Sequence, residues 1–151
     1  MIDVRVVTLD DSAEIFNLRN NALTREMSHS PDKIEWDDHC KWFECALKNP
    51  YRILLICEDK LKNKIAVVRF DLCKDVATVS INLSPSQRGK GNSRPCLISS
   101  IEFMTSKVYS ITSVLAEIKE INLASQKLFI GAGFQLYKED SGVGFYKKII
   151  R

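Results

Sequence analysis

Hydrophobic and polar residues along this chain follow two periods, and the changes of period predict its elements. Residues 2–8 alternate between apolar and polar, as a half-buried strand does, and strand-like runs follow over 52–57, 64–72, 76–83 and 114–118. Helix-like spacing covers 11–23, 35–47 and 97–107, and a short helix ends at the pair Gly131 and Gly133. A hairpin over 135–138 and 144–150 closes the chain. The predicted order is β-α-α-β-β-β-loop-α-β-α-β-β.

This order predicts one α+β domain over 1–151 with a mixed central sheet. There is no repeat, low-complexity tract or linker, and 151 residues are enough for one core. Asp11 and Glu14 form a plausible capping pair at the start of the first helix.

Composition narrows the class of protein. Hydrophobic residues make up 45% and charged residues 27%, which is typical of a soluble globular domain. A net charge of +3 suits an anionic cofactor but is too small to predict a nucleic-acid partner. Neither a membrane span nor a signal-peptide core is visible, and the five cysteines have no CxxC spacing. We therefore expect a cytoplasmic protein with reduced cysteines, no metal and no membrane partner.

The loop between the strand at 76–83 and the next helix carries the main chemical signal. Residues 84–93 read Ser-Pro-Ser-Gln-Arg-Gly-Lys-Gly-Asn-Ser. Two glycines around a lysine allow the backbone to curl with its N–H groups inward, and a helix N-terminus adds free donors. The run lacks the spacing of a P-loop and the third glycine of a dinucleotide fingerprint. It predicts a site for a phosphate or pyrophosphate.

This loop, from Arg88 to Ser93, resembles the acetyl-CoA pyrophosphate loop of the GNAT N-acetyltransferases, with Ser93 where the family has glycine or alanine. The strand at 114–118, Asn122 and the pair Gly133-Phe134 resemble a second block of that family, in the right order. The resemblance covers nearly the whole chain. It implies acetyl-CoA as the cofactor and an α/β/α sandwich with a mixed, mostly antiparallel sheet, whose pyrophosphate loop precedes the third main helix.

The resemblance also implies roles for particular residues. Cofactor contacts fall on Ile81, Leu83, Arg88, Gly89, Lys90, Gly91, Asn92, Ser93, Asn122, Ser125 and Phe129. A main-chain N–H near 81–83 is expected to polarise the thioester carbonyl during direct attack by an amine in a ternary complex. Many members protonate the leaving thiolate with a tyrosine at the position of Phe129. Here Tyr137, Tyr146 or water takes that role.

Two residues are candidates for the general base. Glu117 lies on the strand beside the cofactor, where it acts on an ammonium directly or through water, or is simply a solvated carboxylate. His39 is the second candidate, although its apolar helix face also fits a packed core histidine. His29 lies in a loop that could line the substrate cleft. Ser80, with Asn82 on the same side of its strand, could bind substrate by hydrogen bonds.

The N-terminal half carries a signal about the acceptor. Its order L-R-N…R-x-M…I…H-x-x-W-F resembles the GNAT branch that acetylates nucleotide-linked 4-amino-6-deoxy sugars. Arg19 and Arg25 could then pair with a diphosphate, and Trp36 or Trp42 could stack on a sugar or base. The same residues also fit ordinary amphipathic helices with solvated arginines.

Three functions of different class remain open. The first is N-acetylation of a small-molecule amine, with a nucleotide-linked amino sugar as the expected partner. The second is acetylation of a protein, of the ribosomal-protein or Nα type. The third is non-catalytic binding of acyl-CoA, which Phe129 in the usual tyrosine position makes credible. A homodimer is possible.

Overall fold

The strands assemble into one seven-stranded sheet of order β1-β2-β3-β4-β5-β7-β6. The computed structural model describes residues 1–151. Its strands are β1 (Asp3–Val6), β2 (Arg52–Glu58), β3 (Lys64–Cys73), β4 (Val76–Leu83), β5 (Ser113–Lys119), β6 (Gln135–Asp140) and β7 (Val143–Ile149). Its helices are α1 (Ser12–Arg19), α2 (Ala22–Met27), α3 (Trp36–Lys48), α4 (Ser93–Lys107) and α5 (Leu123–Gly131), with short 3-10 turns at Leu9–Asp11 and Pro85–Gln87.

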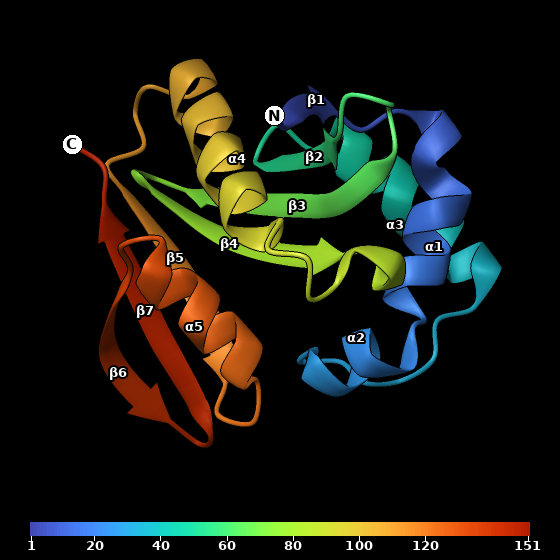
Figure 1. Ribbon diagram of the computed structural model, residues 1–151. Helices are drawn as coiled ribbons and strands as arrows, with labels where there is room; N and C mark the ends of the chain where they lie inside the picture. Colours follow the sequence, from blue (N-terminus) through green and yellow to red (C-terminus); the bar gives the residue numbers. More distant parts are fainter.

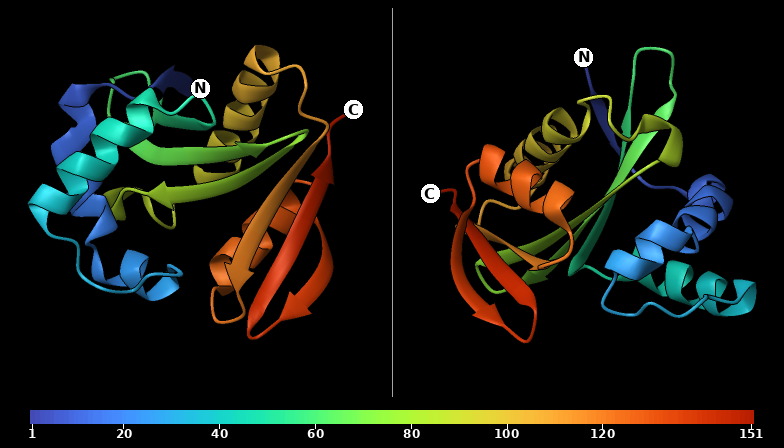
Figure 2. Two further views of the ribbon diagram at one scale, coloured as in Figure 1. Left: turned by 180° about the vertical axis from the view of Figure 1, so that it is seen from behind. Right: turned by 60° about the horizontal axis from the view of Figure 1, so that its bottom comes forward.

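Helices cover both faces of the sheet (Figures 1 and 2). Helices α4 and α5 lie on one face, and α1, α2 and α3 lie on the other. The main core of 20 buried residues joins the sheet to α4 and α5. A smaller core of six buried residues, which includes Phe43 and Leu54, lies under α1 and α3. The predicted α+β sandwich with a mixed, mostly antiparallel sheet is confirmed.

The sheet opens between β4 and β5. Strand β4 is antiparallel to β3 along its whole length, from Val76 to Leu83. It is parallel to β5 only from Val76 to Thr78, paired with Ser113 to Leu115. Beyond this point the two strands diverge, as Figure 1 shows. Residues 79–83 therefore present an unpaired strand edge to the gap.

The prediction of one helix over 11–23 was wrong. The chain forms the separate helices α1 and α2, because Asn21 has ψ of 133° and its Oδ1 accepts from Thr24 N at 3.3 Å to start α2. Asp11 does not pair with Glu14; its Oδ2 accepts from Thr8 N at 2.8 Å. The loop at 84–93 consequently precedes the fourth helix, not the third.

Two other boundaries moved. Helix α4 begins at Ser93 and not at 97, because Pro95 fits the first turn of a helix, where its missing N–H is not needed. In the closing hairpin the first strand is longer than expected and the second is shifted by one residue; Ser141 and Gly142 join them, both in the left-handed region at φ of 51° and 79°. None of the helices is both long and apolar enough to cross a membrane.

Candidate active site

The loop before α4 is shaped by two glycines. Gly89 and Gly91 both have φ of +75°, a left-handed conformation that favours glycine, and a Cβ at either would meet no atom within 4 Å. The backbone therefore borders open space. Lys90 between them is exposed.

The start of α4 has free hydrogen-bond donors. Asn21 and Asn122 cap α2 and α5 with their side-chain oxygens, whereas Asn92 makes no capping hydrogen bond at α4. The first N–H groups of α4, including that of Ser93, consequently lack an intrahelical partner. Together with the curled loop and the positive end of the helix dipole, they form a site that fits a diphosphate.

The gap between β4 and β5 offers backbone hydrogen-bond donors on the strand that leads into that loop. Ser84 N donates to Ile65 O at 2.8 Å, which fixes the alternation of hydrogen bonds between β3 and β4. The main-chain groups of Leu83 and Ile81 therefore point away from β3, toward the gap. This is the arrangement expected from the sequence for polarising a carbonyl.

Helix α5 borders the other side of the gap. Asn122 Oδ1 accepts from Ser125 N at 3.1 Å and so caps the helix. Phe129 is 3% exposed and packs edge-to-face on Phe134, with ring centroids 4.9 Å apart. Without a hydroxyl, Phe129 can only shape the wall of the gap.

Glu117 and Ser80 lie on the face of the sheet that carries α1, α2 and α3. On β5, Ala116 and Ile118 are buried in the main core, so the exposed Glu117 between them points to the opposite face. Ser80 is directly opposite Arg69 in the register of β4 and β3. Both candidates lie beyond the last paired residues of β4 and β5, where the gap is open. We call this surface the acceptor face.

Tyr146 lies on the other face, buried in the main core and 5% exposed. Its ring leans back along β7, because a Cβ at Gly144 would lie 3.0 Å from Tyr146 Cε1 and 3.6 Å from Cζ. Gly144 is opposite Ile118 and Tyr146 is opposite Ala116. The ring therefore leans toward the part of β5 that has separated from β4.

His39 is placed as a structural residue, which corrects its interpretation as a base. The side chain is 0% exposed. Arg19 Nη1 donates to Nδ1 at 3.0 Å, so the proton is on Nε2, which donates to Ser12 O at 3.0 Å. Burial and the charge of Arg19 lower the pKa of His39. With both nitrogens engaged and no exposed atom, the imidazole has no access to a substrate.

The side chain of Arg88 makes contacts that the sequence did not predict, while a cofactor contact through its backbone stays a prediction. Its guanidinium donates to Asn21 Oδ1 at 3.2 Å and to Thr24 Oγ1 at 3.1 Å, so the side chain ties the loop to α2. The cofactor loop and a helix of the acceptor face are thus joined directly. Sequence reasoning missed this contact, because nothing in the pattern near Asn21 points to residue 88.

Arg94 is a second residue that sequence reasoning missed. It lies in the first turn of α4, and a Cβ at Gly131 would overlap its guanidinium. The glycine at the end of α5 therefore leaves room for the Arg94 guanidinium, which packs against the backbone there. The only signal in the sequence that could have indicated Arg94 is its position directly after Ser93, the last residue of the predicted loop.

The remaining candidates are spread over the acceptor side. Arg19 Cζ stacks 3.9 Å from the centre of the Trp42 ring. Arg25 is half-buried with Nε unpartnered, and His29 is exposed between α2 and α3. Trp36 packs on Phe16, with ring centroids 5.0 Å apart, and is 45% exposed. Trp42 rather than Trp36 is therefore the tryptophan next to arginines.

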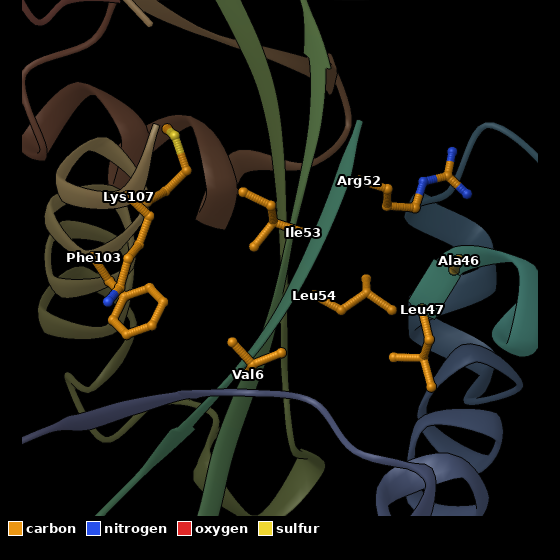
Figure 3. A pocket seen from close by; sticks show the side chains of 9 residues that line it. Val6, Ala46, Leu47, Arg52, Ile53, Leu54, Phe103 and Lys107 are labelled. Atoms are coloured by element: carbon orange, nitrogen blue, oxygen red, sulfur yellow. The ribbon is translucent and has the colours of Figure 1, made fainter. Parts of the chain in front are cut away.

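A pocket of about 230 Å³ at the β2 edge of the sheet is a separate feature. Ile53 points toward Phe103 of α4, and Leu54 points toward Leu47 of α3 (Figure 3). Strands β3 and β4 separate this edge from the gap. No group of three or more His, Cys, Asp and Glu side chains is arranged to hold a metal ion.

Solved structures share this fold. A spermidine N-acetyltransferase from Vibrio cholerae, in complex with CoA and spermine, aligns with a TM-score of 0.87 over 98% of this chain and 95% of that one, at 17% identity. A domain from Methanocaldococcus jannaschii aligns with a TM-score of 0.84 over 99% of each chain, at 20% identity. A dodecameric structure of the Vibrio cholerae enzyme aligns at 0.81 over 98% and 93%, at 18% identity. No curated protein sequence matches significantly.

The sequence itself also matches a family. The profile described as "Acetyltransferase (GNAT) domain" matches residues 2–135, which is most of the chain. Acetyl-CoA, the expected cosubstrate, agrees with this match. It also agrees with the site: the loop and the uncapped start of α4 fit the diphosphate, and the gap between β4 and β5 fits the extended arm. This chain belongs to the GNAT family and is an acetyl-CoA-dependent N-acetyltransferase.

Proposed function

We propose that this enzyme transfers acetyl from acetyl-CoA to the primary amine of a nucleotide-linked amino sugar. The observation that carries the proposal is the open gap between β4 and β5. The backbone of Ile81 and Leu83 lies along the β4 edge of this gap, and Glu117 of β5 projects from the other edge onto the acceptor face. The resemblance of the N-terminal helices to sugar-nucleotide acetyltransferases supports a nucleotide-linked amino sugar as the acceptor.

The cosubstrate would be held mainly by backbone. The N–H groups of the curled loop and of the α4 N-terminus would hold the diphosphate, with Lys90 and Arg94 adding charge at its edge. Asn122 and Ser125 would contact the arm beside α5. Acetyl-CoA supplies an activated acetyl group as a thioester, and a main-chain N–H at 81–83 would polarise its carbonyl.

Glu117 is the proposed general base. The acceptor is an ammonium at neutral pH and must become a neutral amine to attack, and a carboxylate on the acceptor face can take this proton directly or through one water. The new N–C bond forms as the C–S bond breaks; Glu117 holds the first proton, the second proton of the acylated nitrogen leaves to water, and the thiolate takes a proton from its own donor. Ser80, on the same face of β4, would orient the acceptor by a hydrogen bond.

Tyr146 is the proposed proton donor to the leaving thiolate, in place of the missing hydroxyl at Phe129. Its ring leans over Gly144 toward the open part of β5. Tyr146→Phe should lower kcat, and adding Phe129→Tyr to that variant should restore it. Tyr137→Phe, on the exposed β6, is the matched control. Equal rates for Tyr146→Phe and wild type would contradict the role.

The similar Vibrio cholerae structure is of an enzyme named for spermidine, and a polyamine is the natural competing acceptor. Polyamines are cationic, and they would meet Arg19 and Arg69 on the acceptor face of this chain. Like charges at short range disfavour binding. The charge of this face therefore favours an acceptor that carries a negative group.

The test is thiol release from acetyl-CoA with UDP-4-amino-6-deoxy sugars. We expect turnover with the wild type, a fall of about 100-fold or more in Glu117→Gln, and no change in Glu139→Gln, a matched exposed strand carboxylate on β6. Binding of CoA without thiol release, for any amine offered, would contradict the proposal and favour a binding module.

The possible homodimer stays a prediction. Strand β6 is exposed along its whole length and pairs only with β7, which leaves one sheet edge free. Light scattering on the purified protein decides between a monomer and a dimer.

A further inference from the structure

Three arginines from different elements lie on the acceptor face, two of them next to Trp42 and the third joined to them through Asp71. Arg19 ends α1, Arg52 begins β2 and Arg69 lies in the middle of β3. The guanidinium of Arg19 lies 3.9 Å from the centre of the Trp42 ring, and that of Arg52 lies 5.9 Å from it. We call Arg19, Arg52 and Arg69 the arginine cluster.

One carboxylate pairs with this cluster. Asp71 lies 2.7 Å from Arg52 Nε and 3.2 Å from Arg69 Nε. The second contact is an ion pair without a hydrogen bond, because Arg69 Nε is buried and has no hydrogen-bond partner. Arg19 has no carboxylate partner and donates to the neutral His39 Nδ1. Three guanidinium charges against one carboxylate leave a net charge of +2.

This excess charge is unfavourable in the protein alone. Burial, followed by the charges of Arg69 and Arg52, lowers the pKa of Arg19. Arg52 and Arg69 are thus close enough to Arg19 to repel it. Half-buried cations normally have an anionic partner, and one that lacks it costs stability until a ligand supplies the charge.

The position of the cluster connects it with the gap. Arg69 is directly opposite Ser80 on β4, at a strand spacing of about 4.8 Å. Ser80 belongs to the part of β4 that has separated from β5. An anion held by Arg69 would therefore lie one strand away from the place where the acceptor amine meets the thioester.

We infer that the arginine cluster binds the diphosphate of the acceptor. This inference rests on the proposed function and names the residues that select its substrate. A diphosphate diester carries two negative charges, which match the net charge of the cluster, and guanidinium groups bind phosphate oxygens in pairs of hydrogen bonds. Trp42, already stacked on Arg19, holds one face of the site in place.

The test measures binding without catalysis. Inorganic pyrophosphate is titrated calorimetrically into the protein saturated with CoA, so that the loop before α4 is already occupied. We expect binding to the wild type, a Kd at least about tenfold weaker in Arg69→Gln and in Arg19→Gln, and no change in Lys60→Gln. Lys60 is an exposed lysine in the turn at the opposite end of β2.

Asp71→Asn should strengthen binding, a result that a misfolded variant cannot produce. Removing this carboxylate frees Arg52 and Arg69 and raises the net charge, so pyrophosphate should bind more tightly. Succinate, titrated in parallel, distinguishes a dicarboxylate from a diphosphate and should bind more weakly. The inference is overturned by absent pyrophosphate binding, by equal Kd values in wild type and Arg69→Gln, by weaker binding in Asp71→Asn, or by preference for succinate.

Failure here and failure of the proposed function look different. If pyrophosphate binds at the cluster but no amino sugar is acetylated, the acceptor is another diphosphate and the cluster stands. If an amino sugar is acetylated while pyrophosphate binds equally to wild type and Arg69→Gln, the function stands and the cluster is overturned.

Discussion

Two charged clusters in this molecule differ in balance. The first, which we call the Asp11 network, joins β1, the turn before α1, and β3. Asp11 is 1% exposed and lies 2.9 Å from Arg5 Nη1 and 2.8 Å from Lys64 Nζ. Arg5 also pairs with Glu58 at 3.1 Å, and Lys64 pairs with Glu14 at 2.9 Å. Every cation here has at least two carboxylates.

The arginine cluster has the opposite composition, with three cations and Asp71 alone. A network in which each cation has two carboxylates, with two cations against three carboxylates in all, stabilises the fold and leaves no cation free to bind an anion. A cluster with excess positive charge on an open face costs stability unless an anion binds there. The comparison predicts that the number of carboxylate partners distinguishes structural arginines from ligand-binding ones.

The largest effect should come from breaking the balanced network. Asp11→Asn removes the buried carboxylate that Arg5 and Lys64 share, leaves Arg5 with Glu58 and Lys64 with Glu14, and should lower the free energy of unfolding by about 3–5 kcal/mol. Urea denaturation measures it. Asp10→Asn, at the exposed neighbouring position, is the matched control and should change stability by less than about 0.5 kcal/mol. Similar losses in the two variants would contradict the structural role.

The same network predicts a dependence on pH. The hydrogen bond from Arg5 holds the pKa of Asp11 well below its usual range, followed in effect by Lys64 and Thr8. Because the folded-state pKa is depressed, this stabilisation is complete above the unfolded value of about 4 and is lost as the pH falls below it. Wild type should lose more stability than Asp11→Asn between pH 5 and pH 3, a window of about two units.

The next effect comes from the unbalanced cluster. Arg69→Gln should weaken binding of the diphosphate acceptor by about 1.5–3 kcal/mol, because hydrogen bonds to a charged group are lost. It should leave the free energy of unfolding nearly unchanged, since repulsion between Arg69 and Arg19 is relieved while the partly exposed ion pair with Asp71 is lost. KM for the acceptor and urea denaturation measure the two quantities. A loss of stability with unchanged KM would make this cluster structural too.

The backbone-built loop offers a third case, which does not depend on charge balance. Gly91→Val places a β-branched residue at φ of +75°, which costs about 1–2 kcal/mol of stability, and fills the open space of the loop. Weaker CoA binding is expected. Gly142→Val is matched in φ, at +79°, and in open surroundings, but it lies in the β6–β7 turn. It should cost similar stability and leave the Kd of CoA unchanged; equal effects on CoA would contradict the loop's role.

The smallest expected effect, from an exposed ion pair, gives the baseline for the other variants. Lys48 and Glu44 form an exposed ion pair at 3.1 Å on α3, part of neither cluster. Lys48→Ala should lower the free energy of unfolding by only about 0.3–0.5 kcal/mol. It should not affect KM for either substrate. A larger change would mean that exposed pairs contribute more here than the comparison assumes.

The cofactor site could be predicted from the sequence because its hydrogen-bond donors are main-chain groups. Gly89, Gly91 and the helix start follow one another along the chain, so their spacing carries the geometry. The order of the elements along the chain and the α+β class followed from local patterns, whereas the main-chain donor near 81–83 followed from the family resemblance.

The acceptor side was less readable because its residues come together only in three dimensions. Arg52 drew no attention, since a single arginine at the start of a strand has no pattern. His39 was misread as a possible base, because periodicity shows which face a residue lies on and not whether both nitrogens are bonded. The break at Asn21 depends on a side-chain cap that competes with continuing the helix.

The most direct test is the ratio of kcat/KM for a UDP-4-amino-6-deoxy sugar to that for spermidine, in wild type and in Arg69→Gln. Wild type should favour the sugar nucleotide by about 100-fold or more, which corresponds to about 2.8 kcal/mol. Arg69→Gln should reduce this ratio by at least about tenfold. A wild type that prefers spermidine, or a ratio that Arg69→Gln leaves unchanged, would contradict an acceptor site built for a diphosphate.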